Sequence, residues 1–213
     1  GFFAYRNTFD IFIPSDNYYT FNFFFKFFGM RSFHWIALSV MFHVFNSFLV
    51  YCICSCVQKL FLSGYNKRLS FFSGLLFLIS PYQTEAVLWE PTSFGMLLSA
   101  FFLLFGSYFL FQYFISAKIF HLLLLPVFFL LAIFSYESSL FFPGICLLAF
   151  LFLWKKNERI MSFKPFLLKI LFPQAGFIFI YFLLCKLWHG HWIWHGGESL
   201  DITVSPFVYT GNF

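Results

Sequence analysis

The sequence predicts an all-α membrane protein, a polytopic bundle of about six transmembrane helices with an external, interfacial segment at its N-terminus. Three observations support this fold class. Hydrophobic residues make up 61% of the chain and charged residues only 10%, so the protein cannot cover itself with a polar surface. Apolar runs of near-bilayer length recur along the chain. The basic residues lie in short clusters between these runs.

Each predicted helix is close to the ~20 residues needed to cross ~30 Å of hydrocarbon. The segments cover residues 34–57, 71–89, 94–116, 119–136, 138–154 and 166–187, within a bundle that spans residues 34–187. The second segment is unusual, because its apolar run stops at Ile79 and a polar stretch containing Pro81 follows. Since proline interrupts helical hydrogen bonding, we expect this segment to be broken or to end early.

The two ends of the chain are expected outside the membrane. Residues 1–33 read as an external segment, in which Pro14 to Asp16 favours a helix start and Gly29 a helix stop. An interfacial helix and an ordinary loop packed on the bundle explain this segment equally well. Residues 188–213 are predicted to start an external loop. Because the chain begins without methionine and stops in a polar stretch, we expect a fragment of a longer protein.

The charges predict one orientation. With the start of the chain outside, nine of the 13 basic residues fall in inner loops, as the positive-inside rule requires. They are Lys59, Lys67, Arg68, Lys118, Lys155, Lys156, Arg159, Lys164 and Lys169. The outer side collects Asp10, Asp16, Glu85, Glu90, Glu137, Glu198 and Asp201. Orientation therefore explains the net charge of +5 better than nucleic-acid binding does, and chemistry is expected at the outer rim.

The strongest local signal is the polar stretch of residues 80–91. The break at Pro81 frees carbonyl groups that lipid cannot satisfy, so this stretch should face protein or a water-filled cavity. Glu85 would lie there, and a carboxylate at membrane depth indicates a functional site. The alternative is that Glu85 and Glu90 are solvated at the outer boundary, with Trp89 as an interface anchor.

Glu137 lies in a second polar stretch, residues 134–139, on the same predicted side as Glu85. We expect the two carboxylates to approach one outer cavity. Carboxylates so placed can act as general bases, hold a divalent cation or bind sugar hydroxyls. The alternative is a tight external turn between two helices, whose serines cap a helix end.

Ser39, His43 and Asn46 form a polar stripe on the first apolar segment, at the spacing of one helix face. Such a stripe usually faces the bundle interior, so interhelical hydrogen bonding is favoured over a catalytic role for His43. The histidines of residues 189–195 are poorly spaced for a metal site. The five cysteines lie inside apolar runs without zinc or disulfide spacing and are interpreted as small apolar side chains.

Three stretches share an order of residues with a known family. They are Phe33-His34 with His43 to Asn46 and Tyr51, Ser80-Pro81 through Thr84-Glu85 to Trp89, and Ser135-Tyr136-Glu137 with Pro143. Together they resemble multi-pass glycosyltransferases of the GT-C class, especially relatives of the dolichyl-phosphate-mannose-protein mannosyltransferases and the membrane half of the transmembrane-and-TPR mannosyltransferases. The resemblance spans residues 30–155. Ser80 and Tyr136 stand where the family pattern has His and Lys.

This resemblance implies transfer of a sugar from a polyprenyl-phosphate donor to an unidentified acceptor, on the external or lumenal face of the plasma membrane or the endoplasmic reticulum. Family members use an acidic residue of the first external loop as catalytic base or metal-linked group. The catalytic candidates here are Asp16, Asp10 and Glu85. The candidates for substrate binding are Glu137, Trp89, Glu90 and His43. A divalent cation is the expected cofactor, membrane lipid is an expected partner and nucleic acid is not.

Two other classes of protein stay open at this point. A multi-pass transporter or channel would also place acidic residues and polar breaks within the membrane, although no inverted repeat accompanies them here. A non-catalytic membrane scaffold would use the polar stretches only as turns. If the protein is an enzyme, its carboxylates should gather in one outer cavity. If it is a transporter, paired broken helices should occur in corresponding halves of the chain.

Overall fold

The computed structural model of the protein describes residues 26–27, 29, 32–62, 65–80, 92–156 and 162–189. Within these ranges the chain is helical and holds no strand, as the all-α prediction requires. Of the predicted external segment, Lys26 and Phe27 are helical. Gly29 has a φ of +58°, a left-handed conformation that favours glycine at a helix end. The other residues of that segment before Ser32 lie outside the described residues.

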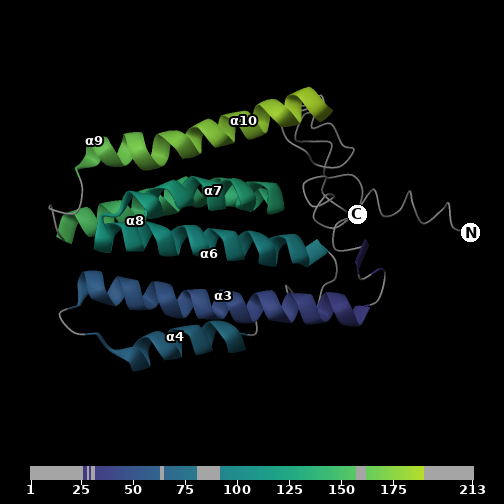
Figure 1. Ribbon diagram of the computed structural model, residues 1–213, viewed down its shortest axis with the longest axis horizontal. Coiled ribbons are helices and arrows are strands. Elements are labelled where there is room, and N and C mark those ends of the chain that lie inside the picture. The colour runs from purple at the N-terminus through teal and green to yellow at the C-terminus, as the bar shows by residue number, and fades with distance from the viewer. Residues whose placement is uncertain are drawn as a thin grey trace, which may run out of the picture.

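Each helix follows an apolar run of the sequence. The elements are α3 (Ser32–Phe61), α4 (Lys67–Ile79), α6 (Thr92–Ser116), α7 (Ile119–Ser135), the 3₁₀ turn η2 (Glu137–Phe141), α8 (Phe142–Lys156), α9 (Phe163–Phe166), the π-helical turn η3 (Leu167–Leu171) and α10 (Phe172–His189). The chain reverses direction from each helical run to the next, and α3 lies between α4 and α6 (Figure 1).

Three helices are long and apolar enough to cross a membrane: Phe33–Phe61, Phe94–Ser116 and Phe163–Leu187. Two further apolar helices, Ile119–Ser135 and Glu137–Phe152, are shorter. The five ranges match five of the predicted segments in position.

α4 ends at Ile79, well before the end of the predicted segment 71–89. This early end was expected from the proline at position 81. The 13 residues of α4 span only ~20 Å, less than the ~30 Å of a hydrocarbon layer. Its start is fixed by Asn66, whose side-chain oxygen accepts hydrogen bonds from the backbone N–H groups of Arg68 and Leu69.

The last helical run starts earlier than predicted, at Phe163 rather than at residue 166. Pro165 explains the difference, because proline is tolerated in the first turn of a helix, where its missing N–H has no helical partner. Pro173 lies inside the run and also lacks an N–H. The backbone widens into the π-helical turn η3 just before this second proline, so the run continues to His189 without a break.

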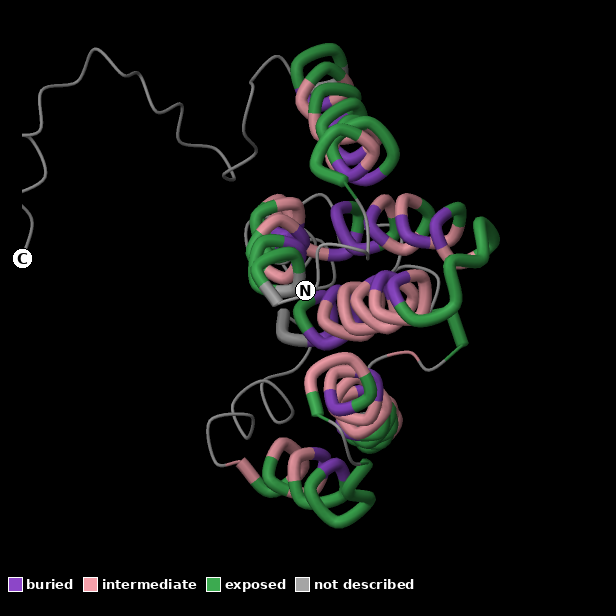
Figure 2. Tube along the Cα trace, turned by 90° about the vertical axis from the view of Figure 1, so that its left-hand side faces the viewer, coloured by how far each residue is buried: buried purple, intermediate pink, exposed green. Residues whose placement is uncertain are grey.

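The apolar core lies mainly between α6, α7, α8 and α10. Its fully buried side chains include Leu125, Phe129, Ile133, Phe142 and Phe150. A smaller cluster of Trp35, Phe94 and Leu98 joins α3 to α6. α3 packs against both α4 and α6. Figure 2 shows buried residues turned between the helices and exposed residues turned outward.

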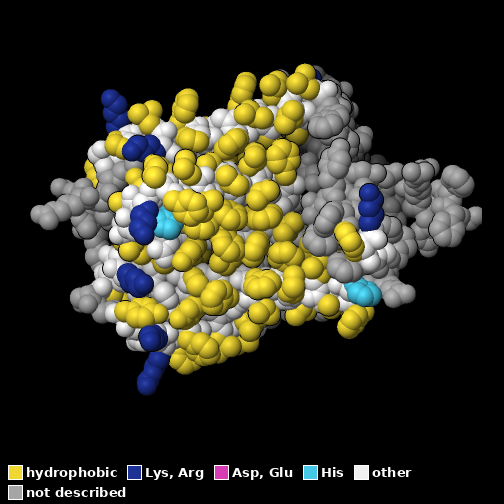
Figure 3. Space-filling view, in the orientation of Figure 1, with side chains coloured by type: hydrophobic (Ala, Val, Ile, Leu, Met, Phe, Trp, Pro, Cys, Tyr) yellow, Lys and Arg dark blue, Asp and Glu magenta, His cyan; other side chains and the backbone are white. Residues whose placement is uncertain are grey.

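The outward faces of the helices are apolar. Large side chains such as Phe48, Leu76, Leu148 and Phe179 are 60%, 63%, 68% and 67% exposed. Figure 3 shows that hydrophobic side chains cover the middle of the visible face almost continuously. A contiguous apolar surface of this extent is unfavourable in water and suited to hydrocarbon.

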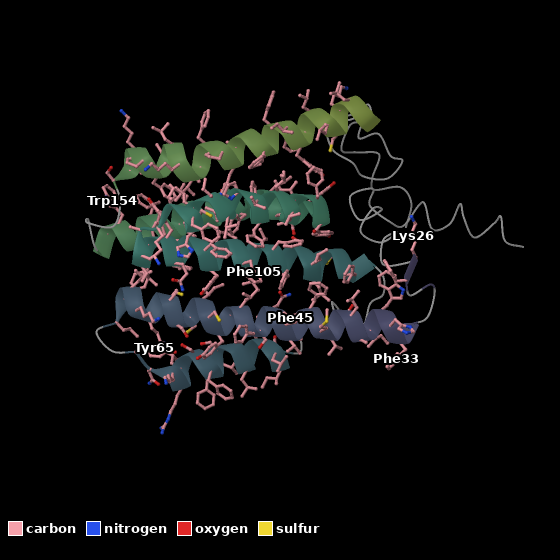
Figure 4. The ribbon with its side chains drawn as sticks, viewed as in Figure 1. Lys26, Phe33, Phe45, Tyr65, Phe105 and Trp154 are labelled. Carbon is pink, nitrogen blue, oxygen red and sulfur yellow. The ribbon has the colours of Figure 1, made fainter. Side chains whose placement is uncertain are left out.

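The charged side chains are segregated along the helices. Lys59, Lys67, Arg68, Lys118, Lys155, Lys164 and Lys169 lie where α3, α6 and α8 end and where α4, α7 and α9 begin, here called the basic end (Figure 3). Lys26 lies at the other end of the bundle, and Tyr65 and Trp154 lie at the basic end (Figure 4). Aromatic and basic residues at one level are typical of a membrane boundary.

Candidate functional site

Two of the predicted site residues, His43 and Glu137, lie in the part of the chain that the structure describes. Asp10, Asp16, Glu85, Trp89 and Glu90 lie outside it. The expected approach of Glu85 to Glu137 therefore also concerns residues beyond the described ranges.

Glu137 opens the short turn η2 between α7 and α8, at the end of the bundle opposite the basic end. The extended backbone of Tyr136, with φ −165° and ψ 134°, ends α7 at this point. The Glu137 side chain is half-buried, and its Oε1 accepts a hydrogen bond from the Tyr181 hydroxyl on α10 at 3.3 Å. Because Tyr181 is itself buried, this contact holds the carboxylate at the seam between η2 and α10.

Ser139 fixes the turn that carries Glu137. Its Oγ lies 2.9 Å from the carbonyl oxygen of Ala132, 2.7 Å from that of Tyr136 and 2.6 Å from Oγ of Ser99 on α6. A hydroxyl has one proton, so the carbonyl groups share the Ser139 proton and Ser99 is the donor in the serine pair. Ser139 caps the end of α7, as the alternative interpretation of this stretch as a turn between two helices expects, and the same network ties the turn to α6.

Glu137 carries the only carboxylate among the side chains that the structure describes. The basic side chains of the basic end are exposed and lie at the far end of α7 and α8. A carboxylate partly withdrawn from water is costly unless hydrogen-bond donors stabilise it. The Tyr181 hydroxyl supplies one such donor to Glu137.

The polar stripe of α3 faces the bundle interior, as predicted: Ser39, His43 and Asn46 are 2%, 7% and 0% exposed. Nε2 of His43 donates to the carbonyl oxygen of Leu78 on α4 at 3.0 Å. Nδ2 of Asn46 donates to the carbonyl oxygen of Leu97 on α6 at 3.1 Å. The favoured interhelical hydrogen bonding is therefore present, and the stripe joins α3 to both neighbours.

A second set of contacts closes the seam between α3 and α4. Oγ of Ser47 donates to the carbonyl oxygen of Gly74 at 2.6 Å, and Nε2 of Gln58 donates to Oγ of Ser70 at 2.7 Å. A Cβ added at Gly74 would lie 3.0 Å from the carbonyl oxygen of Ser47. The two helix backbones approach closely because Gly74 has no side chain.

The described residues contain no group of three or more His, Cys, Asp or Glu suited to hold a metal ion. All five cysteines are free. Cys56, Cys146 and Cys185 are buried, as expected for small apolar side chains. Cys54 also lies 3.4 Å from the hydroxyl of Ser73, within the α3–α4 seam.

The helical fold, the apolar outward faces and the charge segregation define an integral membrane protein. Comparison of the chain with protein-family models, with curated proteins and with solved structures finds no match. The candidate site is therefore defined only by the contacts described above.

Tyr181 and Ser99 were not among the predicted site residues. Each lies in an apolar run, 44 and 40 residues away in sequence from the group it contacts. A polar hydroxyl within a Phe-rich segment is the one signal that the sequence offered for them. It does not reveal the partner, because the partner depends on which helices become neighbours.

Proposed function

We propose that this chain is the membrane part of a GT-C-like glycosyltransferase. It transfers a sugar from a polyprenyl-phosphate donor to an acceptor at the external or lumenal face of the plasma membrane or the endoplasmic reticulum. Two lines of support meet at Glu137, which belongs to one of the resembling stretches. The first is the order of residues that resembles this class, and the second is the position of Glu137.

In this proposal the chain crosses the membrane about six times, with the basic end inside and Glu137 outside. The reversal of direction at each connection supports the alternation of inner and outer turns. The 13 residues of α4 are too few to cross the membrane alone, although the chain reverses direction on both sides of this helix. The N-terminal segment then lies on the outer or lumenal side, together with the acidic candidates.

The single observation that carries the proposal is the half-buried Glu137 carboxylate, held by Tyr181 at the end of a strongly apolar bundle. Lipid anchors make polyprenyl-phosphate sugars amphipathic, with a hydrocarbon tail and a polar head. A ligand of this kind suits a site whose polar groups lie at the rim of an apolar surface. Phe141, the last residue of the same turn, is 79% exposed and supplies apolar surface at that rim.

The reaction needs a base that takes the proton of the acceptor hydroxyl while the oxygen attacks the anomeric carbon of the sugar. The bond from that carbon to the phosphate oxygen breaks, and the polyprenyl phosphate leaves with the electron pair. A divalent cation or basic groups stabilise the leaving phosphate. The base is assigned to Asp16, Asp10 or Glu85. The substrate contacts are assigned to Glu137, Trp89, Glu90 and His43.

Transfer from labelled polyprenyl-phosphate sugars by the full-length protein in lipid bilayers tests this proposal. Replacing the catalytic base, by Asp16→Asn or Glu85→Gln, should lower the rate by at least about 100-fold. Glu137→Gln keeps the size of the side chain but removes its charge and should raise KM more than it lowers kcat. Glu158→Gln, in the predicted inner loop, is the matched control and should leave the rate unchanged.

The outcomes separate the assignments from the function. Full transfer by both Asp16→Asn and Glu85→Gln would remove the assignment of the base while leaving the transferase in place. A wild-type protein that transfers no sugar from any polyprenyl-phosphate donor would reject the function itself. Loss of transfer on chelation, restored by Mg²⁺ or Mn²⁺, is expected if a cation stabilises the leaving phosphate.

A further inference from the structure

Three cations gather where α3 ends and α4 begins. Lys59 lies in the last turn of α3, and Lys67 and Arg68 are the first two residues of α4. All three side chains are exposed. The only carboxylate among the described side chains, that of Glu137, lies at the opposite end of the bundle, so no described acidic group neutralises these cations. We call Lys59, Lys67 and Arg68 the α4 cation cluster.

Tyr65, in the connection between the two helices, holds the cluster together. Nζ of Lys59 lies 5.9 Å from the centroid of the Tyr65 ring, and the Tyr65 hydroxyl lies 3.3 Å from Oγ of Ser55 on α3. The hydrogen bond with Ser55 lowers the pKa of Tyr65. The positive charges of Lys67 and Lys59 also lower this pKa, so both ammonium groups are close to one side chain. Figure 4 shows Tyr65 beside the start of α4.

The charge of the cluster is unbalanced within its own helix. The N-terminal end of a helix carries a partial positive charge, which disfavours cations in the first turn. α4 nevertheless has Lys67 and Arg68 there and no acidic residue. The backbone is already capped, because the Asn66 side chain accepts hydrogen bonds from the N–H groups of Arg68 and Leu69. What an anion would neutralise here is therefore side-chain charge rather than a set of free backbone donors.

Exposed apolar side chains continue from these cations along α4. Phe71 follows Lys67 by four residues, and the ring is 59% exposed. Phe72 follows Arg68 by four residues and is 55% exposed, so each ring shares a helix face with one cation. Leu76 extends the Phe72 face by another turn and is 63% exposed. A ligand that fits this surface has an anionic head and an apolar tail.

We propose that the α4 cation cluster binds the headgroup of an anionic phospholipid in the leaflet at the basic end. A guanidinium can donate two parallel hydrogen bonds to one phosphate, and the two lysines add charge beside it. A soluble anion would leave the apolar face of α4 unused, and a zwitterionic lipid would bring a further cation to the cluster. The inference requires that the bundle lies in a membrane, but it does not depend on sugar transfer.

Native mass spectrometry of the purified full chain in detergent tests the site through the first lipid that binds. Detergent makes the measurement independent of orientation in a bilayer. Phosphatidylglycerol should bind the wild-type protein at least about 5-fold more tightly than phosphatidylcholine with the same acyl chains. Lys67→Gln combined with Arg68→Gln should weaken the binding of phosphatidylglycerol by about 5- to 25-fold. Lys67→Arg combined with Arg68→Lys keeps both charges and should stay within about 2-fold of wild type.

Lys118→Gln combined with Lys155→Gln is the matched control, because it removes the same charge from the basic end on other helices. This control should weaken binding by less than about 2-fold. Equal weakening by the two glutamine double variants would overturn the site, since the preference would then reflect the overall charge of the basic end. Equal affinity of the wild-type protein for the two lipids would overturn it as well. Displacement of phosphatidylglycerol by glycerol phosphate at the same concentration would show that a soluble anion suffices and would contradict a lipid site.

Discussion

At the scale of single residues, the polar side chains of this apolar bundle stabilise it by bonding across helices. Ser139 combines two roles, because it caps the last turn of α7 through Ala132 and contacts α6 through Ser99. In hydrocarbon such contacts replace bonds that water would otherwise supply. A single hydroxyl therefore positions the turn that presents Glu137.

Ser139→Ala should destabilise the protein by about 1–2 kcal/mol, because it leaves the buried Ser99 hydroxyl without its partner and removes the donor to two carbonyl groups. Thermal unfolding in detergent, followed by circular dichroism, measures this loss. Ser138→Ala is the control, since the neighbouring Ser138 side chain is exposed and should contribute less than about 0.5 kcal/mol. Equal stability of the two variants would show that the network does not hold the turn.

At the scale of elements, α4 depends on α3. It is too short to span a membrane, its outward face is apolar, and its described interhelical hydrogen bonds go to α3. Ser47 and His43 bind carbonyl groups of α4, and Gly74 lets the backbones approach. The position of α4 therefore depends on the absence of a side chain at one residue.

Gly74→Ala should lower stability relative to Gly144→Ala by about 1–3 kcal/mol. Both changes gain about 1 kcal/mol of helix propensity, so their difference isolates packing. The new Cβ at position 74 meets the backbone of Ser47 at 3.0 Å, whereas nothing lies within 4 Å of a Cβ at position 144. Unfolding of the two variants under identical conditions checks this. Equal unfolding temperatures would contradict a tight α3–α4 seam.

At the scale of the whole molecule, the sequence predicted helix positions better than helix partners. The segment predicted at 119–136 is Ile119–Ser135, and that at 94–116 is Thr92–Ser116, because polar residues bound each apolar run. Partners were not predictable, since 41 phenylalanines blunt the periodicity that would reveal an inward face. The stack of Phe105 on Phe128, with ring centroids 5.1 Å apart, is one such contact (Figure 4 labels Phe105).

Only part of the candidate site was predictable, because the rest depends on which helices become neighbours. Glu137 stood out because a carboxylate between apolar runs is locally unusual, and His43 stood out because its stripe has helical spacing. Tyr181 reaches Glu137 only after α10 packs against α7. A contact between distant segments depends on the arrangement of the whole bundle, which local sequence does not encode.

The charge segregation of the bundle predicts its orientation in the membrane. An epitope tag inserted between Ala117 and Lys118, in the exposed connection of α6 and α7, should be protected from antibody in sealed right-side-out vesicles. Replacing Lys59, Lys67 and Arg68 by Gln removes much of the bias and should produce mixed orientations, with the tag partly accessible. The same substitution at Lys26 and Lys186, near the other end, is the control and should keep the tag protected. A tag fully accessible in the wild-type protein would place the basic end outside. Glu137 would then face the cytoplasm, so it could not contribute to the sugar transfer proposed for the outer face.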